Sequence, residues 1–210
     1  MDKQFYNSAS AEKLGWEPDW FKSGLTEFDK KLEKAIRAFQ REHGLKADGM
    51  CGPSTYRRIY TWRESKQELV YDQEVLHNDK SHILYNTEYF PIDWPKVILP
   101  HDRGGLEFQK GFRRSNKLRK PRMFVTHWDV CLNAKTCFKV LNRRGLSIHF
   151  TIDNDGTIMQ HMDLNHVAFH AGSKRWNDAS IGCEISNAYY PKYQSWYKKN
   201  VGIERPIAQA

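Results

Sequence analysis

Apolar residues recur at steps of three and four between residues 28 and 43, at Phe28, Leu32, Ala35, Ile36 and Phe39. This spacing places a single apolar stripe on a helix, so it predicts an amphipathic helix that Gly44 ends. Two glycine-containing turns follow, and Pro53 is placed to open a second helix that reaches Trp62. The first part of the chain is therefore predicted to be a compact helical unit.

The pattern weakens between residues 66 and 119. Prolines are scattered through this stretch, and a basic run, "KGFRRSNKLRKPR", covers residues 110–122. We predict a linker here, followed by the entry strand and loops of a second domain. A basic run of this kind is more often a solvated loop than a binding patch.

Short apolar runs return after residue 120. "MFVTHWD" predicts a strand, "SIHFTID" and "TIMQHMD" predict a hairpin around the turn "NDG", and "ASIGCEIS" predicts a further buried strand. A helix is expected in "AKTCFKVLNRR". The predicted fold class is α/β, with a small helical domain at 1–65, a linker and entry segment at 66–119, and a mixed β-sheet domain flanked by helices at 120–210.

Composition narrows the class of protein. Hydrophobic residues make up 40% of the 210 residues, which is enough for a core, and a net charge of +8 attracts polyanions without choosing among them. The first residues hold no signal-peptide pattern and no membrane span, so synthesis in the cytoplasm and no membrane insertion are expected. The four cysteines are too few and too irregular for a disulfide framework or a zinc module, although Cys131 and Cys137 lie near enough in sequence to pair under oxidising conditions.

Three histidines and one glutamate lie in or beside predicted strands, where a sheet commonly carries metal ligands and catalytic groups. His127 ends an apolar strand, His149 lies inside one, and His170 precedes a turn of small residues. Glu184 lies in an otherwise apolar strand, where burying a carboxylate without a partner is costly. These four residues are therefore candidates for ligand binding or catalysis.

Two resemblances follow from longer motifs. "AIRAFQREHGLKADGMCGPSTYRRI" resembles the small three-helix peptidoglycan-binding domain of cell-wall hydrolases, with Cys51 where that family usually has an aliphatic or aromatic residue. "VTHWD", "SIHFTIDNDGTIMQHMDL", "VAFHAG" and "NDASIGCEISN" resemble, in order and approximate spacing, the zinc-dependent N-acetylmuramoyl-L-alanine amidases, which include phage lysozyme-type amidases and peptidoglycan recognition proteins.

The second resemblance implies a role for each candidate. It makes His127 the first Zn²⁺ ligand and Glu184 the general base, and it makes His149, His170 and Asn177 residues of the substrate-binding wall and loops. Some members have a tyrosine before the equivalent of His149, where this chain has Ile148, so more of the catalysis is expected to rest on Glu184. A hydrolytic zinc site needs three protein ligands and an open position for water.

The remaining zinc ligands that the resemblance implies, a histidine and then an aspartate or cysteine, are not found after Glu184. Either the 210 residues are a fragment of a longer enzyme, which we favour, or the natural protein has lost zinc. The leading hypothesis is a monomeric, endolysin-like amidase that cleaves bacterial peptidoglycan, acting after release from the cell or as part of a virion. A non-catalytic wall-binding protein is the alternative, and a nucleic-acid partner is not expected because no such module is recognisable.

Overall fold

The computed structural model describes residues 2–64, 81–186 and 191–201. Contacts divide the chain into two compact units, one built from residues 1–68 with 199–201 and the other from 69–198 with 202–210. The predicted boundary at residue 65 falls in a segment outside the described residues and stays a prediction. Among the described helices none is long and apolar enough to span a membrane.

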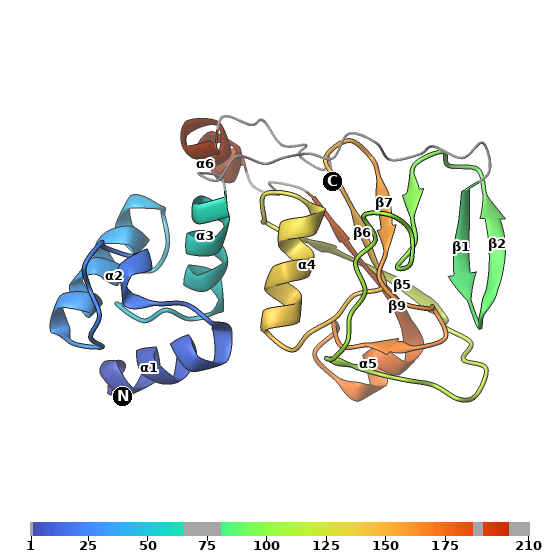
Figure 1. Cartoon of the computed structure of the whole chain (residues 1–210), viewed down its shortest axis with the longest axis horizontal. Helices are drawn as coiled ribbons and strands as arrows, with labels where there is room; N and C mark the ends of the chain where they lie inside the picture. The colour runs from blue at the N-terminus through green and yellow to red at the C-terminus, as the bar shows by residue number, and fades with distance from the viewer. Residues whose placement is uncertain (1, 65–80, 187–190, 202–210) are drawn as a thin grey trace. The chain divides into compact units, whose positions relative to one another are not determined.

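The first unit contains three α-helices and a short 3-10 turn (Figure 1). They are α1 (Lys3–Leu14), η1 (Pro18–Trp20), α2 (Lys30–Glu42) and α3 (Pro53–Glu64). Helices α2 and α3 match the two predicted from periodicity. Helix α1, capped by the Asp2 side chain and ended by Gly15 at φ 70°, completes the three helices that the resemblance implied, although its own apolar pattern is weak. The stripe residues Leu32, Ile36 and Phe39 are buried, as expected for the core side of α2.

Two buried amide side chains hold the glycine-containing turns of this unit. Gln40 donates to the Asp48 carboxylate and to the Met50 carbonyl, and it accepts the Gly49 N–H at 2.8 Å. Asn7 of α1 accepts the Cys51 N–H at 2.9 Å and donates to the Gly49 carbonyl. Cys51 itself is fully buried, so it fills the family's apolar position as a small hydrophobic side chain.

The second unit is built on a five-stranded mixed sheet with the order β3-β7-β6-β9-β5. Its strands are β3 (Val97–Ile98), β5 (Met123–Trp128), β6 (Phe150–Ile152), β7 (Ile158–Gln160) and β9 (Ser180–Ile185). Strand β9 lies between β5 and β6 and runs parallel to both, whereas β6 and β7 form the predicted antiparallel hairpin. The described helices are α4 (Ala134–Arg143), α5 (Lys174–Ala179) and α6 (Pro191–Val201), of which residues 199–201 are grouped with the first unit.

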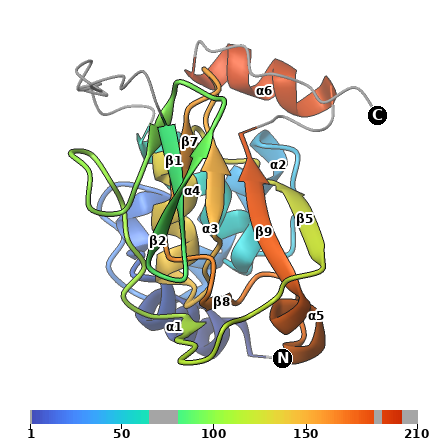
Figure 2. The ribbon, with the colours of Figure 1, turned by 90° about the vertical axis from the view of Figure 1, so that its right-hand side faces the viewer.

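The described part of the predicted linker and entry segment, residues 81–119, contains β3 and three further strands. Strands β1 (Ser81–Tyr85) and β2 (Glu88–Ile92) form a hairpin whose turn residues Asn86 and Thr87 have positive φ, and β4 (Phe112–Arg113) pairs with β8 (Val167–Ala168). Figures 1 and 2 show the hairpin on one face of the sheet and α4 on the other.

The two faces of β9 carry different residues. Ile181, Cys183 and Ile185 pack in an apolar cluster that includes hairpin residues Ile83 and Tyr85. Because side chains alternate along a strand, Gly182 and Glu184 belong to the opposite face, which is the α4 side. The sheet therefore separates an apolar core beneath the hairpin from a more polar face.

Candidate active site

The candidate site lies where β5 and β9 end side by side. The register of this parallel pair places His127 opposite Glu184 and Val125 opposite Gly182. Side chains at paired positions of neighbouring strands point to the same face of a sheet. An imidazole and a half-buried carboxylate are thus adjacent on the polar face, as the assignment of ligand and base requires.

His170 reaches this face from the loop after β8. Its Nδ1 lies 2.9 Å from His127 Nε2, and its Nε2 lies 3.0 Å from the Ser180 hydroxyl. The Ser180 hydroxyl donates its only hydrogen to the Trp176 carbonyl at 2.7 Å, because a carbonyl can only accept. The Ser180 oxygen must therefore accept from His170 Nε2–H.

This chain of hydrogen bonds assigns both tautomers. Since Nε2 of His170 carries the proton, its Nδ1 is an acceptor, and His127 Nε2–H must donate to it. The lone pair of His127 then lies on Nδ1. That atom is the one His127 can offer to a metal ion or to a donor on a substrate.

Burial keeps these imidazoles neutral. Desolvation lowers the pKa of His127, and desolvation together with the neighbouring His127 and Arg119 lowers the pKa of His170 to about 4. A neutral imidazole retains the lone pair that metal binding or proton acceptance requires. The pair is therefore held in the form that can act as an acceptor at neutral pH.

Gly182 leaves the space that the His170 ring occupies. A Cβ built on Gly182 would lie 2.6 Å from His170 Nδ1, 2.7 Å from its Cε1 and 2.5 Å from Ile148 Cδ1. Any side chain at this position would have to displace the ring or Ile148. The glycine of "SIGCE" is thus required by the close approach of His170 to the strand.

Asn177 of α5 holds the loop that carries His170. Its side-chain oxygen accepts the backbone N–H groups of His170 and Ala171, at 3.2 and 2.8 Å. The side chain is nearly buried. Its contacts in this structure are with the loop backbone, so Asn177 positions His170, and its predicted contact with substrate stays a prediction.

His149 lies beneath the site. It is fully buried, its Nδ1 accepts the Gly182 N–H at 3.0 Å, and its Nε2 lies 3.1 Å from the His166 carbonyl. Burial, partly offset by the His166 carbonyl, lowers its pKa to about 3. His149 precedes β6 rather than lying inside it, and with both nitrogens engaged it supports the β9 backbone; its predicted role in binding substrate stays a prediction.

Arg119 is a site residue that sequence reasoning missed, because it belongs to a run of similar cations. Its guanidinium donates to the carbonyls of Leu164, Asn177 and Ser180 at 2.8 to 3.2 Å, and it lies 3.1 Å from His149 Nε2. It therefore ties the α5–β9 junction to the neighbouring loop. Arg119 is half-buried, whereas the other cations of the basic run between residues 113 and 122 are exposed, as expected of a solvated loop.

A second buried imidazole lies beside the site. His161 Nδ1–H donates to the Leu106 carbonyl at 2.8 Å, so its Nε2 accepts the Thr151 hydroxyl hydrogen, also at 2.8 Å. Thr151 pairs with Glu184 in the β6–β9 register. Burial lowers the pKa of His161 to about 4, so this network is neutral.

The described residues do not form a zinc site by themselves. Across residues 2–64, 81–186 and 191–201 no group of three or more His, Cys, Asp or Glu side chains is arranged to hold a metal ion. His127 Nδ1 can supply one ligand, whereas a catalytic zinc needs three. All four cysteines are buried free thiols, so they belong to the fold of their units.

Comparison with known families identifies both units. The N-acetylmuramoyl-L-alanine amidase family matches residues 117–202, and a family described as "putative peptidoglycan binding domain" matches residues 12–59. The chain therefore combines a domain of the amidase family with an N-terminal domain of the peptidoglycan-binding family. Both resemblances drawn from the motifs are confirmed.

Individual relatives are more distant. A Rickettsia conorii protein named "Putative N-acetylmuramoyl-L-alanine amidase" is 41% identical over 75 residues, which cover 32% of this chain and 28% of that protein. The chain thus spans less than a third of that relative's length. A crystal structure of a selenomethionine AmpD derivative aligns with 51% of this chain and 76% of its own, at 17% identity and a TM-score of 0.30.

Proposed function

We propose that this protein is a peptidoglycan hydrolase that cleaves the amide bond between N-acetylmuramic acid and the L-alanine of the stem peptide. The observation that carries the proposal is the adjacency of the His127–His170 pair and Glu184 on one face of the amidase domain. The helical unit supports peptidoglycan as the partner, because it belongs to a family described as wall-binding.

Each residue has a proposed task. Glu184 accepts the proton of the attacking water and can return it to the leaving amine, which is the task of a general base followed by a general acid. His170 lies beside the scissile bond and contacts the substrate, while Asn177 and Gly182 fix the position of its ring. His149 and Arg119 hold the β9 backbone on which these groups depend.

Zinc dependence is part of the proposal, with His127 as one ligand. A bound zinc ion would lower the pKa of a water molecule and polarise the scissile carbonyl. The described residues alone do not fit a retained zinc ion, so its other ligands are proposed to lie outside them.

Zinc retention by the 210-residue chain tests this ligand count. We expect well below one equivalent of zinc after dialysis, because the described residues supply one ligand where a catalytic site needs three, and each ligand contributes a large share of the binding free energy. Elemental analysis of the purified chain, with His127→Ala as the matched variant, gives the measurement. One retained equivalent that is lost in the variant would show that two further ligands are present.

Digestion of purified peptidoglycan tests the proposed activity. The gene product that carries these residues, supplied with zinc, should release stem peptides with a free L-alanine amino terminus, detected by mass spectrometry. Glu184→Gln should release them at least about a hundredfold more slowly, because it removes the general base. If the gene product frees no stem peptides, the proposal fails.

A non-catalytic wall-binding protein is the second candidate, and the incomplete metal site among the described residues favours it. This candidate predicts that the protein sediments with peptidoglycan equally well with and without a chelator, and that Glu184→Gln changes nothing. Any hydrolysis that the chelator stops would exclude it. The pairing of a wall-binding unit with an amidase unit supports an endolysin-like role over this candidate.

A further inference from the structure

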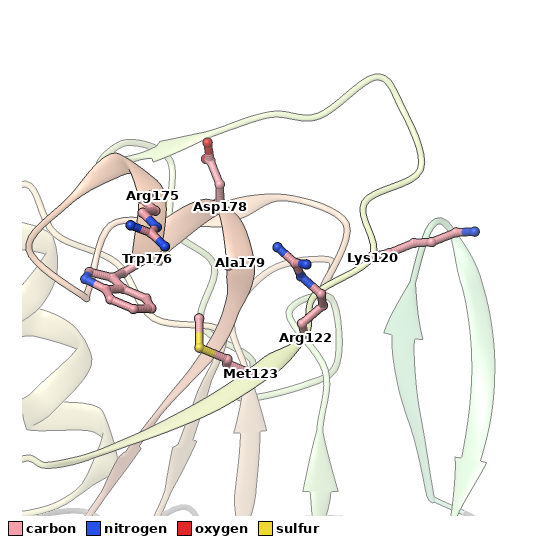
Figure 3. Close-up of a pocket in the computed structure, with 7 residues that line it drawn as sticks. All are labelled: Lys120, Arg122, Met123, Arg175, Trp176, Asp178 and Ala179. Atoms are coloured by element: carbon pink, nitrogen blue, oxygen red, sulfur yellow. The ribbon is translucent and has the colours of Figure 1, made fainter.

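A basic pocket lies at the opposite end of the β5–β9 pair. Its volume is about 420 Å³, and seven residues line it: Lys120, Arg122, Met123, Arg175, Trp176, Asp178 and Ala179 (Figure 3). Figure 3 shows them around the start of β5 and the junction of α5 with β9. The pocket borders the residues that position His170, because Asn177 and Ser180 lie next to its lining residues Trp176, Asp178 and Ala179.

The pocket and the candidate active site open on the same face of the sheet. Met123 and His127 are four residues apart on β5, so their side chains share a face. At about 3.3 Å per residue they are about 13 Å apart along the strand. A ligand in the pocket would therefore lie about 13 Å from His127, on the side of His170 where Ser180 holds its ring.

The charge of the pocket is strongly one-sided. Lys120, Arg122 and Arg175 are exposed, and no ion pair joins them to a carboxylate within the part of the chain that the structure describes. The single acidic lining residue, Asp178, already pairs with Lys174 at 2.6 Å and with Arg113. The hydrogen bond from Lys174, aided by Arg113, lowers the pKa of Asp178, so its negative charge is present and compensated.

An apolar surface accompanies the cations. The Trp176 side chain is 47% exposed, the Arg175 guanidinium lies 5.3 Å from its ring centroid, and Met123 is half-buried beside it. An indole plane backed by a guanidinium can pack against the carbon face of a sugar or polyol while the cations bind its anionic groups. The exposed indole and the neighbouring cations together fit a ligand that carries both sugar or polyol units and anionic groups.

We propose that this pocket binds a phosphate-bearing wall polymer, in which phosphodiesters link sugar or polyol units. Three lining cations, Lys120, Arg122 and Arg175, have no ion pair among the described residues, so a ligand with repeated negative charges neutralises more of them than a single carboxylate does. Guanidinium groups also match the oxygens of a phosphate in bidentate geometry. The pocket would hold the enzyme on an anionic envelope independently of the amide bond that it cuts.

Binding of synthetic poly(glycerol phosphate) to the 210-residue chain tests the proposal without any hydrolysis. The dissociation constant is measured at 50 and 200 mM salt for the chain and for the triple variant Lys120→Gln, Arg122→Gln, Arg175→Gln. We expect binding that weakens with salt, because counterions are released, and a loss of at least tenfold in the triple variant. Lys110→Gln, which removes an exposed charge of the same basic run that does not line the pocket, should change the constant less than twofold.

Competition experiments distinguish the proposed wall polymer from other anionic ligands. A muramyl tripeptide that displaces the polymer at an equal or lower concentration of anionic groups would make the pocket a stem-peptide subsite and overturn the proposal. A DNA oligonucleotide of equal charge that binds more tightly would also overturn it, as would equal binding by the triple variant. Arg122→Gln alone should give a partial loss, and its thermal unfolding curve verifies that the fold is intact.

Discussion

The two ends of the β5–β9 pair use basic side chains in opposite ways. From Gly182 to the C-terminal end of the pair, which we call the imidazole end, burial keeps His127, His149 and His170 neutral, with the pKa of His149 lowered to about 3. At the N-terminal end, which we call the cation end, the guanidinium groups of Arg122 and Arg175 are exposed. One end is thus prepared for proton acceptance and ligand binding by lone pairs, and the other for attraction of anions, within about 13 Å on one sheet face.

Arg119 lies where α5 joins the start of β9, and its replacement should give the largest effect on stability. Replacing Arg119 by Met removes hydrogen bonds to several buried carbonyls and leaves them without a donor, so we expect a loss of about 3 to 5 kcal/mol in the free energy of unfolding. Urea titration measures it. Lys117→Met changes an exposed residue of the same run and should lower the free energy of unfolding by less than about 0.5 kcal/mol. Equal losses in the two variants would show that the hydrogen bonds of Arg119 do not stabilise the fold.

The neutral histidines should make stability depend on pH. His149 and His161 have pKa values of about 3 and 4 when folded, below the value of about 6.5 when unfolded, so the unfolded state binds more protons between about pH 4 and 6.5. Stability is therefore complete above pH 6.5 and falls as the pH decreases. From pH 7 to 5 each should cost about 2 kcal/mol.

His161→Gln separates one of these contributions, because glutamine keeps hydrogen-bonding groups but does not titrate. Its unfolding free energy, measured from pH 7 to 5, should fall by about 2 kcal/mol less than that of the unchanged chain. An identical pH slope in the two proteins would mean that His161 is not held neutral by burial.

Gly182→Ala tests whether the His170 ring packs directly against β9 at the imidazole end. The added Cβ cannot coexist with the His170 ring in its present position, so we expect a loss of about 1 to 3 kcal/mol and a displaced ring. Imidazole NMR signals of His127 and His170 should shift, while those of His161, which belongs to a separate network, should not. Unchanged His170 signals would contradict the close packing.

The cation end should contribute least to stability. The triple glutamine variant of Lys120, Arg122 and Arg175 changes exposed side chains without ion pairs among the described residues, so its unfolding free energy should change by less than about 0.5 kcal/mol. Thermal or urea unfolding measures this. A larger loss would show that these charges support the fold rather than a ligand.

Periodicity predicted the elements whose apolar residues repeat, such as α2, α4 and the β6–β7 hairpin. It missed the β1–β2 hairpin, because β2 is largely exposed and contains Pro91, which argues against a strand. It also could not distinguish Arg119 from neighbouring cations, since only the folded chain brings the carbonyls of three distant residues to one guanidinium.

The motif resemblance selected His127, His170 and Glu184 as site residues. The fold brings their side chains together on one face of the β5–β9 pair. The hydrogen-bond partners of His149 and Asn177 could not be predicted from the motifs. Both are turned toward backbone groups, His149 toward Gly182 and Asn177 toward the His170 loop. Hydrogen-bond direction depends on packing between segments that are far apart in sequence.

Cleavage of a small soluble substrate compares the two ends most directly. The rate at which the zinc-supplied gene product frees an L-alanine amino terminus from muramyl dipeptide should fall at least about a hundredfold with Glu184→Gln, because the general base is lost. The triple variant at the cation end should keep its rate within about twofold, because Met123, which lines the pocket, lies about 13 Å along β5 from His127. Cleavage that survives Glu184→Gln at an unchanged rate would contradict the assignment of the active site to the imidazole end.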